Sequence, residues 1–256
     1  MSGALASYQN DVSWLLHDVN NLFTPLGQLT RWINQARDRV AQDSGCLRAL
    51  VAGQSPFGAT ATAGNAVPGG AVPGQAAFTT FNTIPSQEFY PYSYATQIGA
   101  AQNRGFRAVI DVFTCAVSWG GAIRPVQNWM PWDQLQAYAR SYNVGVFSYP
   151  FVWATSGAGA SNRLWLWPAP SVITEMEWDC GFVPKPLNTN DDYEAIPEPF
   201  QGAIKYWAAR DAAYAKRDYG QANEMEKQYW SSLVKAGSSS DRSKIPDYYV
   251  DWTTWG

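Results

Sequence analysis

Apolar residues recur at spacings of three and four positions near both ends of the chain, and this periodicity is typical of helices with one buried face. Near the N-terminus it predicts a helix over residues 4–23 and a second helix that begins at Thr24-Pro25, an N-cap followed by proline, and stops at Gly45. Near the C-terminus it predicts a helix that starts close to residue 198 and a last helix that Gly237 closes. Helices at both ends can pack into one bundle, so the segment between them is an insertion.

The middle of the chain has a different pattern. Residues 53–77 are rich in Ala, Gly, Pro and Thr and repeat Ala-Val-Pro-Gly, which predicts a linker or an arm that becomes ordered on a neighbour. Beyond them, short alternating or aromatic segments predict strands. The expected elements are strands at Ala108–Val117, Ile123–Val126, Val144–Trp153, Arg163–Trp167 and Thr174–Val183, and a short helix at Pro131–Tyr142. Because Pro150 cannot donate to a ladder, the strand Val144–Trp153 is expected at a sheet edge.

These patterns predict an α+β fold. It consists of an antiparallel helical bundle from both terminal regions, an inserted β-rich, sandwich-like domain and an extended C-terminal tail. The predicted segments are 1–52 and 188–237 for the bundle, 53–77 for the arm, 78–187 for the inserted domain and 238–256 for the tail. No run of about 18 apolar residues occurs, so no membrane-spanning helix is predicted.

Aromatic residues are frequent in this chain, whereas charged residues are sparse. Phe, Trp and Tyr make up 15% of the 256 residues. Charged residues also make up 15%, below the roughly 25% typical of soluble domains. The formal net charge of -3 gives no general attraction to nucleic acid. Because protein interfaces concentrate Tyr and Trp and exclude charge at their centres, the composition favours either extensive contact surfaces or an aromatic β-rich core.

Side chains with catalytic or metal-binding chemistry are few. His17 is the sole histidine, and a structural role is expected for it. Cys46, Cys115 and Cys180 are widely spaced, so neither a zinc site nor a disulfide framework is predicted. The acidic loop Asn188–Asp192 lacks the glycine and the spacing of a calcium-binding loop. We therefore predict no catalytic residue, no metal site and no cofactor.

Two patterns leave a carbohydrate-related alternative open. Glu175, Glu177 and Asp179 would share one face of a strand, and paired carboxylates can hydrolyse glycosides. A strand with one face in water has the same alternation, and this interpretation needs no further assumption. Exposed tryptophans could stack on sugars, although tryptophans that face a core or a subunit interface would be spaced in the same way. The candidates are Trp165, Trp167 and Trp178.

The order of several segments resembles that of phage proteins. The stretch Leu29–Ala41, followed by Ser44–Arg48, is similar to the opening of tail-tube-A-like and portal-adaptor proteins of short-tailed phages. The other matching segments are Trp178-Asp179, Asp191-Asp192, Ile196–Phe200, Lys205–Ala209 and Tyr219–Ala222, together with Val117–Pro125 and Trp129–Asp133, which resemble uncharacterised virion proteins of the same kind. Each motif is a helix face or a turn, so the resemblance rests on their order along the chain.

This resemblance implies a non-enzymatic structural subunit of a virion, a head-to-tail adaptor. Such adaptors form a twelve-fold ring that docks on the portal protein, and each subunit of a ring needs two different complementary faces. The ring extends the channel through which genomic DNA passes without sequence-specific binding, and it carries the tail nozzle or tail fibres. The protein would be made in the host cytoplasm and would reside at the portal vertex, the head–tail junction.

The resemblance and the sequence together indicate contact residues. The C-terminal segment of this family commonly reaches onto the portal, and here Ile245, Tyr248, Tyr249, Trp252 and Trp255 are suited to anchor it. Candidates for contacts within the bundle or between ring subunits are Trp32, Arg37, Trp207 and Trp230. A surface made of Arg31, Arg37, Arg39 and Arg48 could contact acidic portal loops. A solvated helix face with ion pairs to Asp38 and Asp43 is the preferred interpretation.

Two other functions stay open at this point. A tail nozzle or tail-tube subunit would bind the adaptor rather than the portal, and the strongly helical ends favour the adaptor. A carbohydrate-binding or depolymerase module would bind soluble glycan as a monomer and would lose this binding when Trp165 or Trp167 is replaced. Within the adaptor hypothesis, the inserted β-rich domain is expected to be the platform for the nozzle or the fibres.

Overall fold

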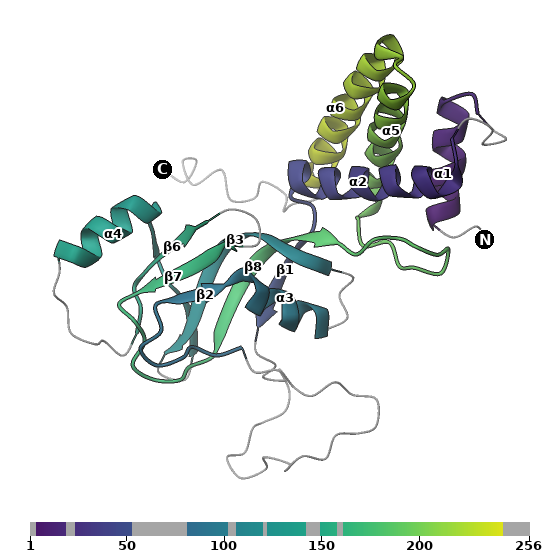
Figure 1. Ribbon diagram of the computed structural model, residues 1–256. Coiled ribbons are helices and arrows are strands. Elements are labelled where there is room, and N and C mark those ends of the chain that lie inside the picture. Colours follow the sequence, from purple (N-terminus) through teal and green to yellow (C-terminus); the bar gives the residue numbers. More distant parts are fainter. Residues whose placement is uncertain are drawn as a thin grey trace, which may run out of the picture. The chain divides into compact units, whose positions relative to one another are not determined.

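The computed structural model describes residues 4–18, 24–52, 81–101, 106–119, 122–141, 149–157 and 161–242 (Figure 1). In these ranges it has six helices and eight strands, and helices at both ends enclose the strands in sequence. The predicted α+β class is therefore confirmed. The chain divides into a helical unit, Met1–Leu47 with Pro184–Gly256, and a β-rich unit, Arg48–Val183.

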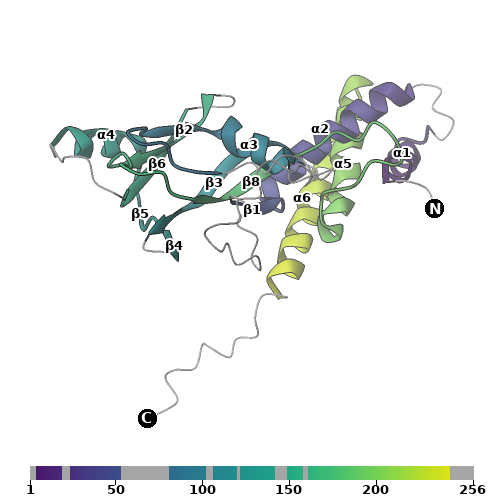
Figure 2. The ribbon, with the colours of Figure 1, turned by 90° about the horizontal axis from the view of Figure 1, so that it is seen from below.

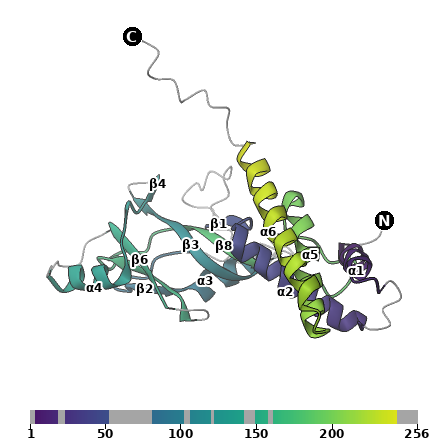
Figure 3. The ribbon, with the colours of Figure 1, turned by 90° about the horizontal axis from the view of Figure 1, so that it is seen from above.

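The helical unit is built from α1 (Ala4–Leu15), α2 (Leu26–Ser44), α5 (Glu198–Ala215) and α6 (Tyr219–Arg242). The predicted apolar stripe of α2 forms the core, because Leu29, Ile33 and Val40 are completely buried. In α5 the buried face consists largely of alanines, whose small side chains allow close helix packing. Helix α5 packs against α1, α2 and α6, and it lies between α1 and α6 (Figures 1 and 3).

The start of this helical unit differs from the prediction at two boundaries. The first helix ends at Leu15 instead of continuing to residue 23. His17 takes a left-handed φ of 54°, and the amide of Asp18 donates to the carbonyl of Ser13 at 2.9 Å, which closes the helix end. The second helix begins at Leu26, because the predicted first helical residue, Pro25, is instead the N-cap with an extended ψ of 138°.

Two predictions about the helix ends concern glycines. Gly45 ends α2 in the left-handed conformation with φ 60°, as predicted. Gly237 was predicted to close the last helix, and this prediction is wrong, because α6 continues to Arg242. A glycine inside a helix costs only about 1 kcal/mol relative to alanine, so favourable packing on either side can carry the helix through it. The predicted extended tail therefore cannot begin at residue 238.

The β-rich unit contains two four-stranded sheets. The first has the order β1-β8-β3-β4, and the second has the order β2-β7-β6-β5. The strands of the first sheet are β1 (Arg48–Ala52), β8 (Met176–Pro184), β3 (Phe106–Trp119) and β4 (Ala122–Pro125), and those of the second are β2 (Phe89–Pro91), β7 (Arg163–Trp167), β6 (Val152–Ser156) and β5 (Asn128–Trp129). The pairs β1–β8, β3–β4, β2–β7 and β6–β7 are antiparallel, whereas β5 and β6 are parallel. The strand β1 pairs with β8, so residues 48–52 belong to the β-rich unit, although the predicted bundle segment extends to residue 52.

The two sheets share an aromatic core, as the predicted sandwich-like arrangement requires. Trp178 of β8 is completely buried, and its ring lies 6.4 Å from that of Tyr90 in β2 and 4.9 Å from that of Phe81. Two helices flank these sheets. Helix α3 (Tyr92–Ala101) packs against β3, and α4 (Trp132–Ser141) packs against β6 at the other end of the unit (Figures 1 and 2).

The edge position expected for the strand Val144–Trp153 is a wrong prediction, and residues 144–148 of this segment lie outside the described residues. The strand β6 begins at Val152, after Pro150, and it lies between β5 and β7 in the interior of its sheet. Because the proline precedes the strand, it takes no position in the hydrogen-bonded ladder and does not force the strand to an edge. Helix α3 was not predicted at all. The strands β7 and β8 and the helix α4 occur where they were expected.

Candidate interaction surfaces

Arg37 forms a buried network inside the helical unit. Its guanidinium is 1% exposed and binds the Glu194 carboxylate, with Nη2 2.8 Å from Oε1 and Nε 3.0 Å from Oε2. Its Nη1 donates to the Lys185 carbonyl at 2.7 Å. Asn34, one turn earlier on α2, donates to the carbonyl of Leu187 and accepts from its amide. Arg37 and Asn34 thus hold the segment between β8 and α5 against α2. A role of Arg37 between ring subunits stays a prediction.

Trp207 lies at the centre of a second network, which joins α2, α5 and α6. The guanidinium of Arg210 lies 4.1 Å from the ring centre of Trp207, and that of Arg39 lies 5.1 Å from it. The ring of Tyr229 packs against Trp207 at 4.7 Å, and its hydroxyl donates to Asp43 at 2.8 Å. Burial and this carboxylate raise the pKa of Tyr229 above its usual range. The described contacts of Trp207 are therefore contacts within the bundle.

The predicted arginine surface is divided among different environments. Arg37 is buried, and Arg39 forms the ion pair with Asp43 that the solvated-face interpretation expected, 2.7 Å from Nε to Oδ2. Arg48 binds the Asp179 carboxylate of the neighbouring strand β8 through Nε at 2.8 Å. These contacts neutralise Arg37, Arg39 and Arg48 inside their own units.

Large apolar side chains lie exposed on two helices that flank α5. On α6, Trp230 is 43% exposed and Val234, one turn later, is 68% exposed. On α1, Trp14 is 70% exposed. Trp32 on α2 is half-buried. Trp14 and Val234 were not singled out from the sequence, but Trp14 lies off the predicted apolar stripe of its helix, and an aromatic residue opposite the buried face was an available signal.

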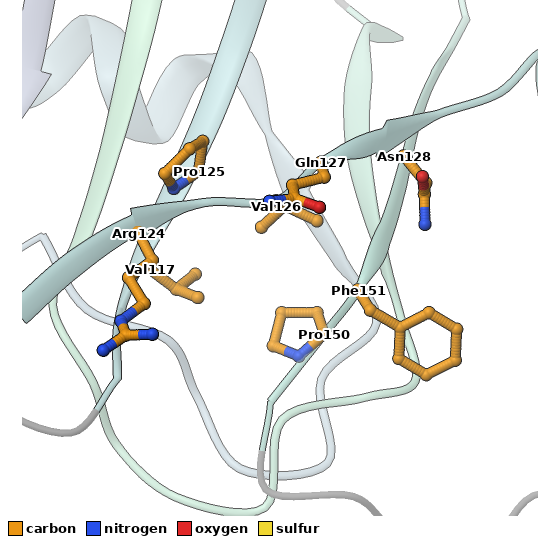
Figure 4. A pocket seen from close by; sticks show the side chains of 8 residues that line it. All are labelled: Val117, Arg124, Pro125, Val126, Gln127, Asn128, Pro150 and Phe151. Atoms are coloured by element: carbon orange, nitrogen blue, oxygen red, sulfur yellow. The ribbon is translucent and has the colours of Figure 1, made fainter.

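The β-rich unit has a shallow pocket of about 220 Å³ between β4, β5 and the segment that precedes β6 (Figure 4). Arg124 lies at one end of it, Asn128 and Phe151 lie at the other, and Pro150 faces Val126. The pocket contains no carboxylate, thiol or imidazole among its lining residues. Its lining is apolar apart from the guanidinium of Arg124 and the amides of Gln127 and Asn128.

Glu177 and Asp179 of β8, and Glu175 just before it, lie as expected for a strand with one face in the core. Met176, Trp178 and Cys180 are buried, whereas Glu177 and Asp179 are half-buried and Glu175, just before the strand, is exposed. Burial and then the charge of Glu175 raise the pKa of the Glu177 carboxyl. Asp179 is engaged by Arg48. The alternation therefore follows from strand packing.

The predicted sugar-stacking tryptophans have different environments. Trp178 is completely buried, and Trp167 is 7% exposed in a small core with Leu135 and Val152. Trp165 is half-buried beside Trp132 of α4. Trp178 and Trp167 are therefore core residues, as the preferred interpretation expected. Trp165 lies at the edge of the small core around Leu135.

Other predicted elements give simpler results. The loop at Asn188–Asp192 closes on itself, because the Asp192 carboxylate accepts hydrogen bonds from the amides of Thr189 and Asn188, and these bonds lower its pKa.

The described residues contain no cluster of three or more His, Cys, Asp or Glu side chains suited to a metal ion. Among the helices that the structure describes, none is long and apolar enough to span a membrane. The arm at 53–77 and the predicted anchors Ile245, Tyr248, Tyr249, Trp252 and Trp255 lie outside the described residues.

Comparison with known proteins gives two matches of different extent. A stretch of 108 residues, 40% of the chain, is 33% identical to endo-1,4-beta-xylanase B of Cellvibrio japonicus (strain Ueda107), of which it covers 16%. The chain thus spans a small part of this relative. The second match is to the SU10 adaptor protein, whose family model covers residues 4–247, through both the helical and the β-rich unit. These adaptors are structural phage proteins that contact portal and tail components in the virion, and this chain belongs to the SU10 adaptor protein family.

Proposed function

We propose that copies of this chain form a closed ring at the head–tail junction of a short-tailed phage. The ring docks on the portal protein, extends the channel for the genomic DNA and carries the tail nozzle or the tail fibres. The observation that carries this proposal is the family match over residues 4–247, which includes both units of the chain. The expected ring has twelve subunits.

The exposed apolar residues of the helical unit support a ring contact. A ring that closes by rotation needs two different faces on each subunit, one for each neighbour. Trp230 and Val234 on α6 form one candidate face, and Trp14 on α1 forms the other, with α5 between these helices. Exposed tryptophans are common anchors of protein interfaces. The proposed ring contact therefore joins the α6 face of one subunit to the α1 face of the next.

The charge of the chain supports a passive channel. A net charge of -3 on 256 residues gives no general attraction to phosphates, so DNA can pass without being held tightly. Arg39 and Arg48, two of the candidate basic residues, are already paired with carboxylates. The proposed binding energy comes instead from apolar and aromatic contacts that are repeated in every subunit.

The C-terminal residues are the proposed portal anchor. Ile245, Tyr248, Tyr249, Trp252 and Trp255 follow α6, which ends at Arg242, and their spacing suits insertion into apolar pockets. The test is co-sedimentation of the purified chain with portal rings. A variant that ends after Arg242 and a full-length variant with these five residues replaced by alanine should both lose binding. If both variants bind as the full chain does, the anchor is elsewhere; if the full chain does not bind, the portal-adaptor hypothesis fails and a nozzle role becomes preferable.

A further inference from the structure

A second pocket of the β-rich unit combines aromatic and polar groups. It has a volume of about 270 Å³ and lies between α4 and the strand β7, beside the residue that precedes β2. The indole rings of Trp132, Trp165 and Trp167 line it, and Glu88, Gln136 and Arg140 supply its polar groups. Ligand pockets typically enclose about 300–1,000 Å³, so this pocket suits a ligand portion of about one ring.

The aromatic wall of this pocket is held in place by its own contacts. The rings of Trp132 and Trp165 lie 4.2 Å apart with an angle of 30° between them. The indole nitrogen of Trp165 donates to Ser156 on β6 at 2.6 Å, and the ring of Trp167 packs edge-on against Tyr138 at 4.9 Å. Both Trp132 and Trp165 are half-buried, so each residue keeps some surface that its neighbours do not cover. A rigid aromatic surface binds without loss of side-chain freedom.

The polar groups of the pocket come from both of its sides. Glu88 precedes β2, whereas Gln136 and Arg140 lie one turn apart on α4. Within the described residues, none of these three side chains has a hydrogen-bond or ion-pair partner. A carboxylate accepts hydrogen bonds, a guanidinium donates them, and an amide does both. The charges of Glu88 and Arg140 have opposite signs, so the pocket does not favour a charged ligand of either sign.

We propose that this pocket binds one neutral sugar ring of an oligosaccharide or polysaccharide. A sugar ring has an apolar C–H face, which can stack on the indoles, and hydroxyls at its edge, which both donate and accept hydrogen bonds. Trp132 and Trp165 provide the stacking surface, and Glu88, Gln136 and Arg140 provide partners for adjacent hydroxyls. Glu88 is the single carboxylate among the lining residues, so the site would bind glycan without cleaving it. This activity is additional to ring assembly and does not depend on it.

The test is an array of immobilised neutral bacterial oligosaccharides, probed with the purified full-length chain in the absence of portal. The oligosaccharide with the strongest signal is then titrated in solution while tryptophan fluorescence is recorded. We expect saturable binding that high salt does not weaken. The variants Trp132→Ala and Glu88→Ala/Arg140→Ala should each weaken it by about tenfold or more, as the loss of one stacking or paired polar contact does.

Two matched variants control for indirect effects. Trp129→Ala removes an exposed tryptophan outside the pocket, and Gln134→Ala changes an exposed residue on the outer side of α4, so both should bind as the original chain does. The proposal is overturned if no oligosaccharide saturates the chain, or if the pocket variants bind as the controls do. It is also overturned if a peptide of residues 243–256 occupies the pocket and no glycan does, since the pocket would then be a docking site between copies of the chain.

Discussion

Arg37 and Glu194 are 157 positions apart in the chain, yet they form a bidentate ion pair in the interior of the helical unit, with Nη2 2.8 Å from Oε1 and Nε 3.0 Å from Oε2. Only 1% of the arginine and 9% of the glutamate side chain is exposed. Because the Arg37 guanidinium also holds the Lys185 carbonyl, the pair fixes the chain where it returns from the β-rich unit to the bundle.

Replacing one partner of this pair should strongly destabilise the protein. Glu194→Ala leaves the Arg37 charge buried without its carboxylate, and such a loss typically costs about 3–5 kcal/mol. The control is Asp11→Asn, which weakens the more exposed ion pair with Lys205 and should cost about 1 kcal/mol or less. Urea unfolding followed by circular dichroism measures both. Equal small losses would show that the buried pair is not essential to the stability of the helical unit.

A glycine at position 217 should stabilise the protein. Arg217 lies between α5 and α6 with a left-handed φ of 62°, which costs a residue with a side chain about 1 kcal/mol relative to glycine. Arg217→Gly should therefore raise the free energy of unfolding by several tenths to about 1 kcal/mol. The matched control is Lys216→Gly, where φ is -80° and glycine should destabilise instead. If both substitutions shift the unfolding midpoint in the same direction, the left-handed turn is not the cause.

The stability should depend on pH through Glu177. Its pKa is raised above the usual 4.5 by burial and by the nearby Glu175. The folded chain therefore binds this proton more tightly than the unfolded chain does, and folding loses stability as the pH rises through the raised pKa. Glu177→Gln should stabilise the protein near neutral pH and have little effect below pH 4.5. Urea midpoints at acidic and neutral pH test this, with exposed Glu88→Gln as control. A pH-independent effect of Glu177→Gln would contradict the account.

The apolar face of α6 should be required for ring assembly. Trp230→Glu with Val234→Glu places two charges in a contact that is proposed to exclude water, and a desolvated charge without a partner is costly. Both positions are exposed in the single chain, so the variant should fold normally, as circular dichroism can verify. Analytical ultracentrifugation in the presence of portal rings should find it unassembled. Gln228→Glu, on an exposed part of the same helix, should assemble, and assembly of the double variant would rule out this face as a ring contact.

The periodicity of apolar residues predicted those helices and strands that have one buried face. The spacing of Leu29, Ile33 and Val40 reports directly on the buried face of α2, and the alternation of Met176, Trp178 and Cys180 reports on β8. Helix ends were harder to predict. His17 and Arg217 take left-handed conformations without being glycine, while Gly237 is a glycine within a helix. The two left-handed residues close helix ends, because the amides of Asp18 and Asp218 donate to the carbonyls of Ser13 and Ala213, and this local hydrogen bonding outweighs the preference of the residue itself.

The interaction surfaces depend on contacts that no local pattern contains. Arg37 was a candidate from its helix, but Glu194, its partner, lies 157 positions away and was not assigned to it. The edge position predicted from Pro150 is wrong, because the strand β6 starts only after this proline. The pocket with Trp132, Trp165 and Glu88 brings together three segments whose proximity is set by the pairing of β2 with β7 and by the packing of α4. Sequence periodicity cannot supply such pairings.

The most direct test of the adaptor account is electron microscopy of the purified chain mixed with portal rings. A closed ring of this chain should cover one face of the portal, with the channel continuous through both rings. The variant that ends after Arg242 should leave the portal uncovered. Portal rings that remain bare in the presence of the intact chain would contradict the central claim.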